Sequence, residues 1–188
     1  MSRYEVFLLI HVVAAIAWLG GGLVLQIQGI RADRAKDADG LRKVLEDVVS
    51  LSNLFFVPAA LLVVIFGIAM VADGPWTFGQ LWIVLGLAGY AATFATGLFL
   101  LDPRSKRILA MMEEEAMSPR VVADVRRLLA LSRIDYAVLY SVVAVMVLKP
   151  TGDDVGILAV LGAIVAGTAV WAVRRARSVA AAEPSATA

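Results

Sequence analysis

Five apolar stretches, each close to the length that crosses a lipid bilayer, constrain this 188-residue chain more than any other feature. They cover residues 6–27, 54–72, 81–101, 134–148 and 155–173. At about 1.5 Å per residue, four of them extend about 28–33 Å, which matches a hydrocarbon core of about 30 Å. The sequence therefore predicts an all-α fold, a polytopic membrane helix bundle with five transmembrane helices in one domain, residues 1–177.

The composition excludes several other classes of protein. Hydrophobic residues make up 61% of the chain, whereas soluble domains hold about 45–50%. A net charge of +1 argues against a nucleic-acid surface. The absence of cysteine excludes disulfides and thiolate chemistry, and a single histidine, His11, excludes a multi-histidine metal site within one chain.

The basic residues predict the orientation of the helices. Fifteen of the 17 basic residues lie in the segments 28–53 and 102–133 or after residue 173, and only Arg3 and Lys149 lie on the other side. Because basic residues collect in cytoplasmic loops, we expect the N-terminus outside and the C-terminus in the cytoplasm. The protein is then a multi-pass component of the bacterial plasma (inner) membrane.

Both cytoplasmic segments are predicted to be helical. Helical spacing of apolar residues follows Asp39, a candidate N-cap, in the stretch Leu41, Val44, Leu45, Val48 and Val49. In the second segment, Ser118 before Pro119 predicts a helix start, and an apolar stripe leads on into the short fourth span. Asp135 then falls at the inner boundary, and Asp102-Pro103 is interpreted as a helix stop.

Short connections at 73–80 and 149–154 predict that spans two and three, and spans four and five, form antiparallel hairpins. The tail, residues 178–188, is rich in Ala and Ser and includes Glu183 and Pro184, so we expect it to be disordered.

His11 is the first candidate site residue. It stands six residues into the first span, where an ionisable side chain is costly unless it faces the bundle. Its helical face continues through Ala14, Ala15, Trp18 and Gly22. The small residues of this face would let another helix or a flat cofactor approach the backbone closely. Two interpretations remain open: a metal or proton site, and a neutral histidine hydrogen-bonded to a neighbouring helix.

Lys149 and two methionines lie at a similar outer level. Lys149 ends the fourth span and is suited to an anionic ligand group, although the helix dipole also favours lysine there. Met146 and Met70 could supply thioethers to haem iron or Cu(I), although methionine more often fills gaps in packing. No nucleophile elbow, phosphate-binding glycine motif or two-histidine spacing is present, so no catalytic residue is identified.

The segment from His11 to Gly21, HVVAAIAWLGG, resembles the opening helix of a superfamily of small bacterial membrane proteins. This superfamily includes the copper-resistance D-type proteins and the J-type protoporphyrinogen oxidase. The segment 145–150, VMVLKP, is similar to the Lys-Pro ending of a late helix in the oxidase members. The whole chain looks most like an uncharacterised predicted integral-membrane branch of this group.

This resemblance implies a haem-binding redox protein with haem b as cofactor and His11 as the metal ligand. Lys149 would correspond to the important lysine of the oxidase members, and Trp18 and Met146 are further candidates for the cofactor site. The alternative is a non-catalytic assembly protein or a component that passes a small solute or copper. The expected partners are the lipid bilayer and a second copy of the chain, with no nucleic acid.

Overall fold

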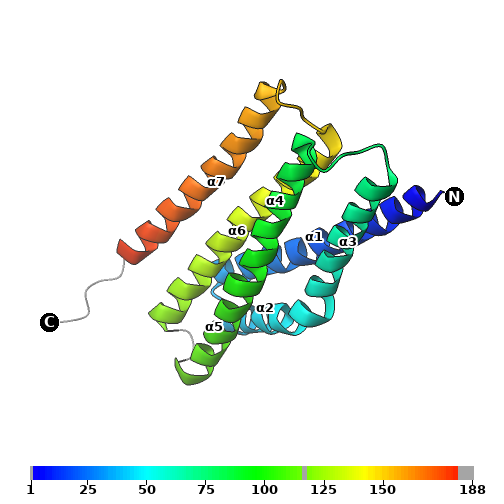
Figure 1. The fold of residues 1–188 in the computed structure, drawn as a ribbon. Coiled ribbons are helices and arrows are strands. Elements are labelled where there is room, and N and C mark those ends of the chain that lie inside the picture. Colours follow the sequence, from blue (N-terminus) through cyan, green and yellow to red (C-terminus); the bar gives the residue numbers. More distant parts are fainter. Residues whose placement is uncertain (1, 116–117, 182–188) are drawn as a thin grey trace.

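The computed structural model describes residues 2–115 and 118–181, and every regular element within these ranges is a helix (Figure 1). The elements are α1 (Arg3–Ala35), α2 (Ala38–Leu51), the π-helical turn η1 (Ser52–Phe56), α3 (Val57–Asp73), α4 (Leu81–Thr96), the π-helical turn η2 (Gly97–Leu101), α5 (Asp102–Glu115), α6 (Pro119–Leu148) and α7 (Val155–Ala181). Five continuous helices in this part of the chain are long and apolar enough to cross a membrane. The predicted all-α bundle with five spans is confirmed.

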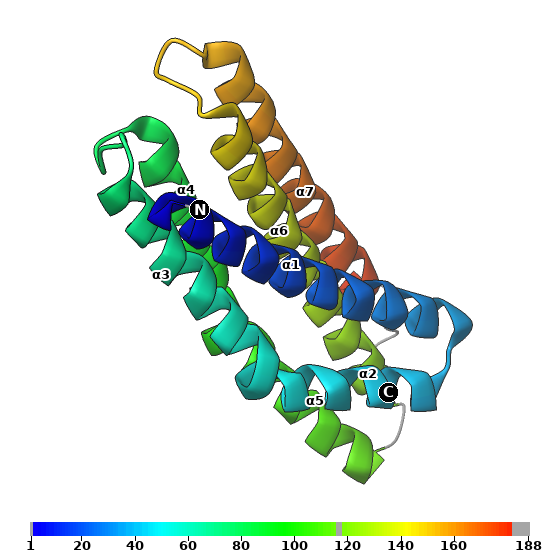
Figure 2. The ribbon, with the colours of Figure 1, turned by 90° about the vertical axis from the view of Figure 1, so that its right-hand side faces the viewer.

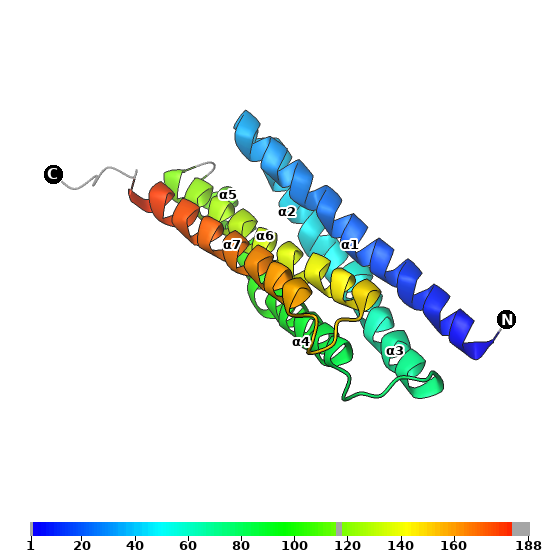
Figure 3. The same ribbon diagram turned by 90° about the horizontal axis from the view of Figure 1, so that it is seen from above.

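The two ends of the bundle differ in charge. The N-terminus of α1 lies at the same end as the α3–α4 and α6–α7 connections, whereas α2, α5 and the end of α7 lie at the other end (Figure 3). We call the latter the basic end, because residues 28–53, 102–133 and 174–177 supply 15 of the 17 basic residues. The start of α1 and the end of α7 therefore lie at opposite ends, as an odd number of spans requires.

Side-chain caps fix the helix starts. Ser2 and Glu5 form a reciprocal capping box at the start of α1, and the Ser118 hydroxyl accepts the Val121 amide at the start of α6, as the Ser-Pro pair predicts. The prediction that Asp39 caps α2 is wrong. Asp37 does so, since its carboxylate accepts the Gly40 amide at 2.9 Å.

Two prolines explain the π-helical turns. Pro58 follows η1, and Pro103 follows η2, each at the second residue of the next helix. Proline lacks the amide that would bond four residues back, and its ring clashes with that carbonyl in a regular helix. A wider π turn relieves the clash, so both helices continue. The interpretation of Asp102-Pro103 as a helix stop is therefore wrong, because the chain is helical from Leu81 to Glu115.

Packing divides the bundle into two halves. In one half α3 packs along α1, and in the other α4 packs along α6 while α7 lies on the outer side of α6 (Figure 2). The predicted hairpin of the last two spans is present. The other predicted hairpin, α3 with α4, has a short connection but few direct contacts, one being the Tyr90 hydroxyl bonded to the Ala60 carbonyl at 3.1 Å. Space is therefore left between the halves.

The best-buried apolar cluster lies at the basic end. It joins the end of α1 to α2, α5 and the first turns of α6, with Val121 fully buried and Leu41 2% exposed. Burial of these side chains explains the apolar stripes seen in both charged segments. Helices α2 and α5 are thus packed elements that close the basic end of the bundle.

The fourth and fifth spans belong to longer helices. The fourth span and the charged segment before it form one 30-residue helix, α6, as expected from the apolar stripe. Helix α7 continues to Ala181, so residues 178–181 belong to a helix and not to a tail. The rest of the predicted disordered tail, residues 182–188, lies outside the described residues.

Candidate functional site

A cavity of about 190 Å³ lies between the two halves of the bundle, nearer to the basic end. Helices α1, α2 and α3 with η1 form one wall, and α4, α5 and α6 with η2 form the other. Both π-helical turns contribute lining residues, among them Ser52 and Gly97. Since π turns are frequent at functional sites, this coincidence supports a functional role for the cavity.

Most of the lining is apolar or aromatic. Trp18 meets Tyr90 edge to face with ring centroids 5.7 Å apart, and Tyr90 stacks on Phe94 at the same distance. Of these three rings, Trp18 and Phe94 line the cavity directly. They form its boundary toward the N-terminal end of the bundle, where Tyr90 also ties α4 to α3.

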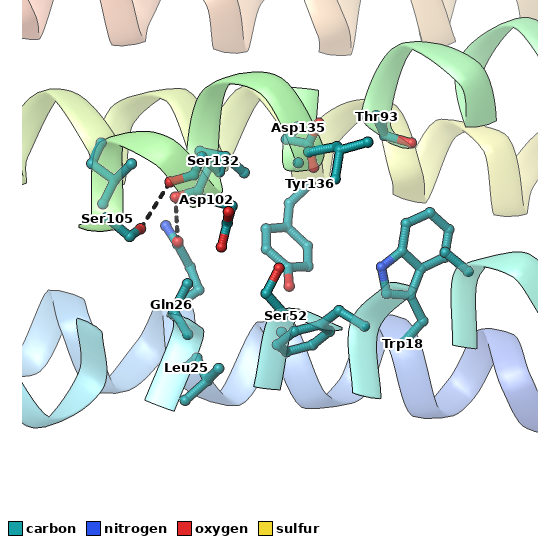
Figure 4. A pocket seen from close by; sticks show the side chains of 18 of the residues that line it. Trp18, Leu25, Gln26, Ser52, Thr93, Asp102, Ser105, Ser132, Asp135 and Tyr136 are labelled. Carbon is teal, nitrogen blue, oxygen red and sulfur yellow. Dashed lines mark hydrogen bonds between the residues drawn. The ribbon is translucent and has the colours of Figure 1, made fainter. Parts of the chain in front are cut away.

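A hydrogen-bonded polar group forms the opposite boundary. The Ser132 hydroxyl donates to Gln26 Oε1, and Gln26 Nε2 donates to the Leu129 carbonyl at 3.3 Å. Figure 4 shows Gln26 projecting from α1 toward Ser132 on α6. These bonds join the two halves and satisfy an amide that is only 9% exposed.

Two carboxyl groups line the same cavity. Asp102 Oδ2 pairs with Lys106 at 2.6 Å, whereas the buried Asp102 Oδ1 has no hydrogen-bond partner. Asp135 lines the cavity from α6, and no hydrogen bond or ion pair reaches it from residues 2–115 or 118–181. The lining includes no lysine or arginine from the described chain, so the cavity is acidic.

Tyr136 extends from α6 across the cavity toward η1 (Figure 4). Its hydroxyl occupies the place where a side chain at position 22 would lie, so only glycine at Gly22 leaves room for it. This pairing holds α1 and α6 at a fixed distance beside the cavity. The triplet Gly20-Gly21-Gly22 is thereby explained in part, because Gly21 likewise receives the Phe55 ring, which an added Cβ would meet at 2.9 Å.

His11 lies outside the cavity, at the contact between α1 and α3. Its Nδ1–H donates to the Val63 carbonyl at 2.8 Å, and the ring packs on Gly67, where an added Cβ would lie 3.3 Å away. Of the two interpretations left open by the sequence, the hydrogen bond to a neighbouring helix is present. Because Nδ1 carries the proton, Nε2 of the neutral ring keeps a lone pair.

The other predicted site residues make contacts of their own. Met146 fills the space over Gly86 between α4 and α6. Lys149 Nζ lies 4.1 Å from the Trp76 ring and 5.5 Å from the Trp82 ring, outside the apolar region. Met70 is part-buried near the end of α3, where its carbonyl crowds Gly74. Only Trp18, of the four predicted cofactor residues, lines the central cavity.

Sequence reasoning placed the polar cavity residues elsewhere. The sequence predicts a helix stop at Asp102-Pro103 and does not single out Gln26. It places Asp135 at the inner boundary but gives no direction for this side chain. The signal available was the placement of two carboxylates within two residues of apolar spans, where such groups usually face protein and not lipid.

Five apolar spans, four of which surround a largely apolar cavity lined also by two carboxyl groups, define a polytopic α-helical membrane protein. Residues 5–150 match the model of the family described as Predicted integral membrane protein (DUF2269), and the chain belongs to that family. No curated protein and no solved structure matches the chain. These comparisons do not link it to the copper-resistance D-type proteins or to the J-type protoporphyrinogen oxidase.

Proposed function

We propose that this membrane protein binds a small cationic solute that has an apolar part, and that the central cavity is the binding site. With the basic end in the cytoplasm of a bacterial cell, as the charge pattern predicts, the cavity lies in the inner half of the bilayer. A solute would then enter from the cytoplasm or from the inner leaflet.

The observation that carries this proposal is the pair of incompletely satisfied carboxyl groups. Asp102 Oδ1 is buried without a partner, and Asp135 faces the cavity without one in the part of the chain that the structure describes. A carboxyl oxygen shielded from water without a partner is costly. A cation in the cavity would supply a partner for Asp135 and for Asp102 Oδ1, whose other oxygen already pairs with Lys106, and Gln26 and Ser132 are polar neighbours.

The size and the walls of the cavity restrict the solute. About 190 Å³ is less than the roughly 300–1,000 Å³ typical of drug-sized ligands. Trp18, Phe56 and Phe94 offer aromatic faces, which attract both cations and apolar groups. The geometry therefore favours a quaternary or protonated amine with one small apolar substituent.

Benzyltrimethylammonium is a suitable probe for a calorimetric titration of the full chain in a non-ionic detergent. We expect saturable binding, with Kd raised at least tenfold, about 1.4 kcal/mol, in Asp135→Asn and in Asp102→Asn. Asp39→Asn is the matched control, because Asp39 is exposed at the same end and the substitution removes the same charge. Binding that is equally strong in Asp135→Asn and the control would contradict the proposal.

Haem binding at His11 is a second candidate, supported by one observation. The bond from Nδ1 to the Val63 carbonyl is the arrangement that commonly orients a metal-ligating histidine, with Nε2 left for the metal. The residues fit a single axial ligand only. Among the described residues no group of three or more His, Asp or Glu could hold a metal, and Met146 and Lys149 are engaged elsewhere.

Visible absorption spectra of the purified protein, oxidised and then reduced with dithionite, test this candidate. A Soret band that His11→Ala removes would support haem, and the absence of such a band after haem supplementation would exclude it. Metal analysis of the same sample separates iron from copper.

A further inference from the structure

A second pocket, of about 250 Å³, lies at the basic end between α5 and α6. Three arginines line it, and together with one aspartate they leave two net positive charges. The lining residues are Arg104, Arg107, Ile108, Asp124, Arg127 and Leu128. None of the preceding proposals uses this pocket, and its charge is opposite to that of the central cavity.

The helical spacing of these residues directs the arginines to one place. Arg104 and Arg107 are three residues apart on α5, so they share a face of that helix. Ile108 and Leu128 lie between the helices as a buried apolar floor, 3% and 8% exposed. The floor packs the two helices side by side, so the arginines of α5 and the one on α6 line the same pocket.

The partners of the arginines leave donors available. Arg127 Nη1 bonds Asp124 Oδ1 at 3.1 Å, which occupies one of the five N–H donors of that guanidinium and restrains its position. Arg104 and Arg107 have no carboxylate within ion-pair distance among the described side chains, those of residues 2–114 and 118–174. Two guanidiniums are thus unpaired, and a third is held in place beside them.

The depth of the pocket matches the membrane boundary. Arg104 follows the last residue of the apolar stretch, Leu101, by three residues, and Arg127 precedes Ile134, where the fourth stretch begins, by seven. At about 1.5 Å per residue these positions lie roughly 5–10 Å beyond the hydrocarbon region, at headgroup level. Basic pockets between helices at this level commonly receive lipid headgroups.

We propose that the pocket between α5 and α6 binds a phosphate group, presented either by an anionic lipid headgroup or by a free phosphate compound. The planar guanidiniums suit bidentate bonds to phosphate oxygens. Asp124 orients Arg127. Its carboxylate also repels negative charge, so it disfavours a ligand that carries several anionic groups. One phosphate group accounts for the two net positive charges of the lining.

Native mass spectrometry of the detergent-solubilised full chain, titrated with dioleoyl phosphatidic acid, tests the site. The pocket variant is Arg104→Gln/Arg107→Gln/Arg127→Gln, for which we expect at least a tenfold loss of affinity, because it removes the guanidiniums that would form charge-assisted bonds to the phosphate. The control is Arg31→Gln/Arg34→Gln/Arg120→Gln, which removes three exposed arginines of the same end and should change the affinity less than twofold.

Two further titrations separate the sources of the phosphate. Inorganic phosphate that competes with the lipid at similar concentrations would assign a free phosphate compound, whereas lipid binding that inorganic phosphate does not displace would assign a headgroup. Oleate supplies charge without phosphate. The proposal fails if oleate binds as tightly as phosphatidic acid, or if the control variant loses as much affinity as the pocket variant.

Folding of the variants is checked by circular dichroism. If the triple variant does not fold, the single variants Arg104→Gln and Arg107→Gln still decide the question, because both side chains are exposed and outside the apolar floor. Each should weaken binding about fivefold or more, because a hydrogen bond to the charged phosphate is lost. Unchanged affinity in both single variants would overturn the proposal.

Discussion

Replacement of Gly89 by alanine measures how closely α4 and α6 are packed. A Cβ at this position would run into Val142 Cγ2 and lie 3.7 Å from Val138 Cγ1. Valine is β-branched and has one strongly preferred rotamer in a helix, so Val142 cannot turn aside. Overpacking of this kind costs about 1–3 kcal/mol. Alanine regains about 1 kcal/mol over glycine through helix propensity, so the net loss should be about 0–2 kcal/mol.

Gly162→Ala on α7 is the matched control, because nothing lies within 4 Å of its added Cβ. The helix-propensity gain is the same in both variants and cancels in the comparison. The difference between the two free energies of unfolding therefore isolates the overpacking cost, about 1–3 kcal/mol. This value can be obtained from unfolding with sodium dodecyl sulfate in mixed micelles, followed by far-ultraviolet circular dichroism.

The double variant Gly89→Ala/Val142→Ala identifies the cause. If Val142 is the obstacle, its truncation makes room for the new methyl group, and the pair should show a favourable coupling of at least about 0.5 kcal/mol. The close packing of α4 on α6 would be refuted if the Gly89→Ala variant is as stable as the Gly162→Ala variant and shows no coupling to position 142.

Two smaller predictions concern the end of the bundle that carries the N-terminus. Lys149→Met should lose the cation–π contact with Trp76 and with it about 0.5–1 kcal/mol of stability. Lys149→Arg should keep the contact and the stability. Equal melting temperatures for the two variants would contradict this prediction. The Thr151 amide and hydroxyl donate hydrogen bonds to Asp154 and hold its pKa below the usual 3.8. The stability that these bonds add is present above pH 3.8 and is lost as the pH falls through the lowered pKa. Melting temperatures of wild type and Asp154→Asn should therefore differ at pH 6 and converge near pH 2.

The positions of the spans could be predicted because length and apolarity alone decide whether a helix crosses a bilayer. The start of α6 was also predictable, since Ser118 and Pro119 are local signals that need no tertiary contact. Partners between helices were not predictable in this way. Side chains that face lipid are as apolar as those that face protein, so nothing in the pattern links Met146 to Gly86 or His11 to Val63, 52 residues away.

The candidate cavity was missed for a related reason. Its acidic residues stand at the boundaries of spans, where a carboxylate facing water is ordinary. What turns them inward is the path of the helices through η1 and η2, and these π turns depend on prolines whose effect in a membrane helix is variable. The sequence of Asp102-Pro103 therefore permits both a helix stop and a continuous helix with an inward carboxylate. Only the packing of α5 on α2 and α6 decides between them.

The space between the two halves is held open by contacts at both ends of the bundle. At the N-terminal end, Trp76 in the α3–α4 connection receives Lys149 from the end of α6 and donates to the Tyr4 hydroxyl of α1. At the basic end the apolar cluster of α2, α5 and α6 performs the same role. Leu45 and Leu128 of this cluster also line the cavity, whereas its other buried residues and the contacts at the N-terminal end lie outside the lining, so the cavity walls need no ligand to keep them apart. Substitutions of Asp102 and Asp135 by asparagine should accordingly change binding with little effect on folding, as is required for the titration to report on the site itself.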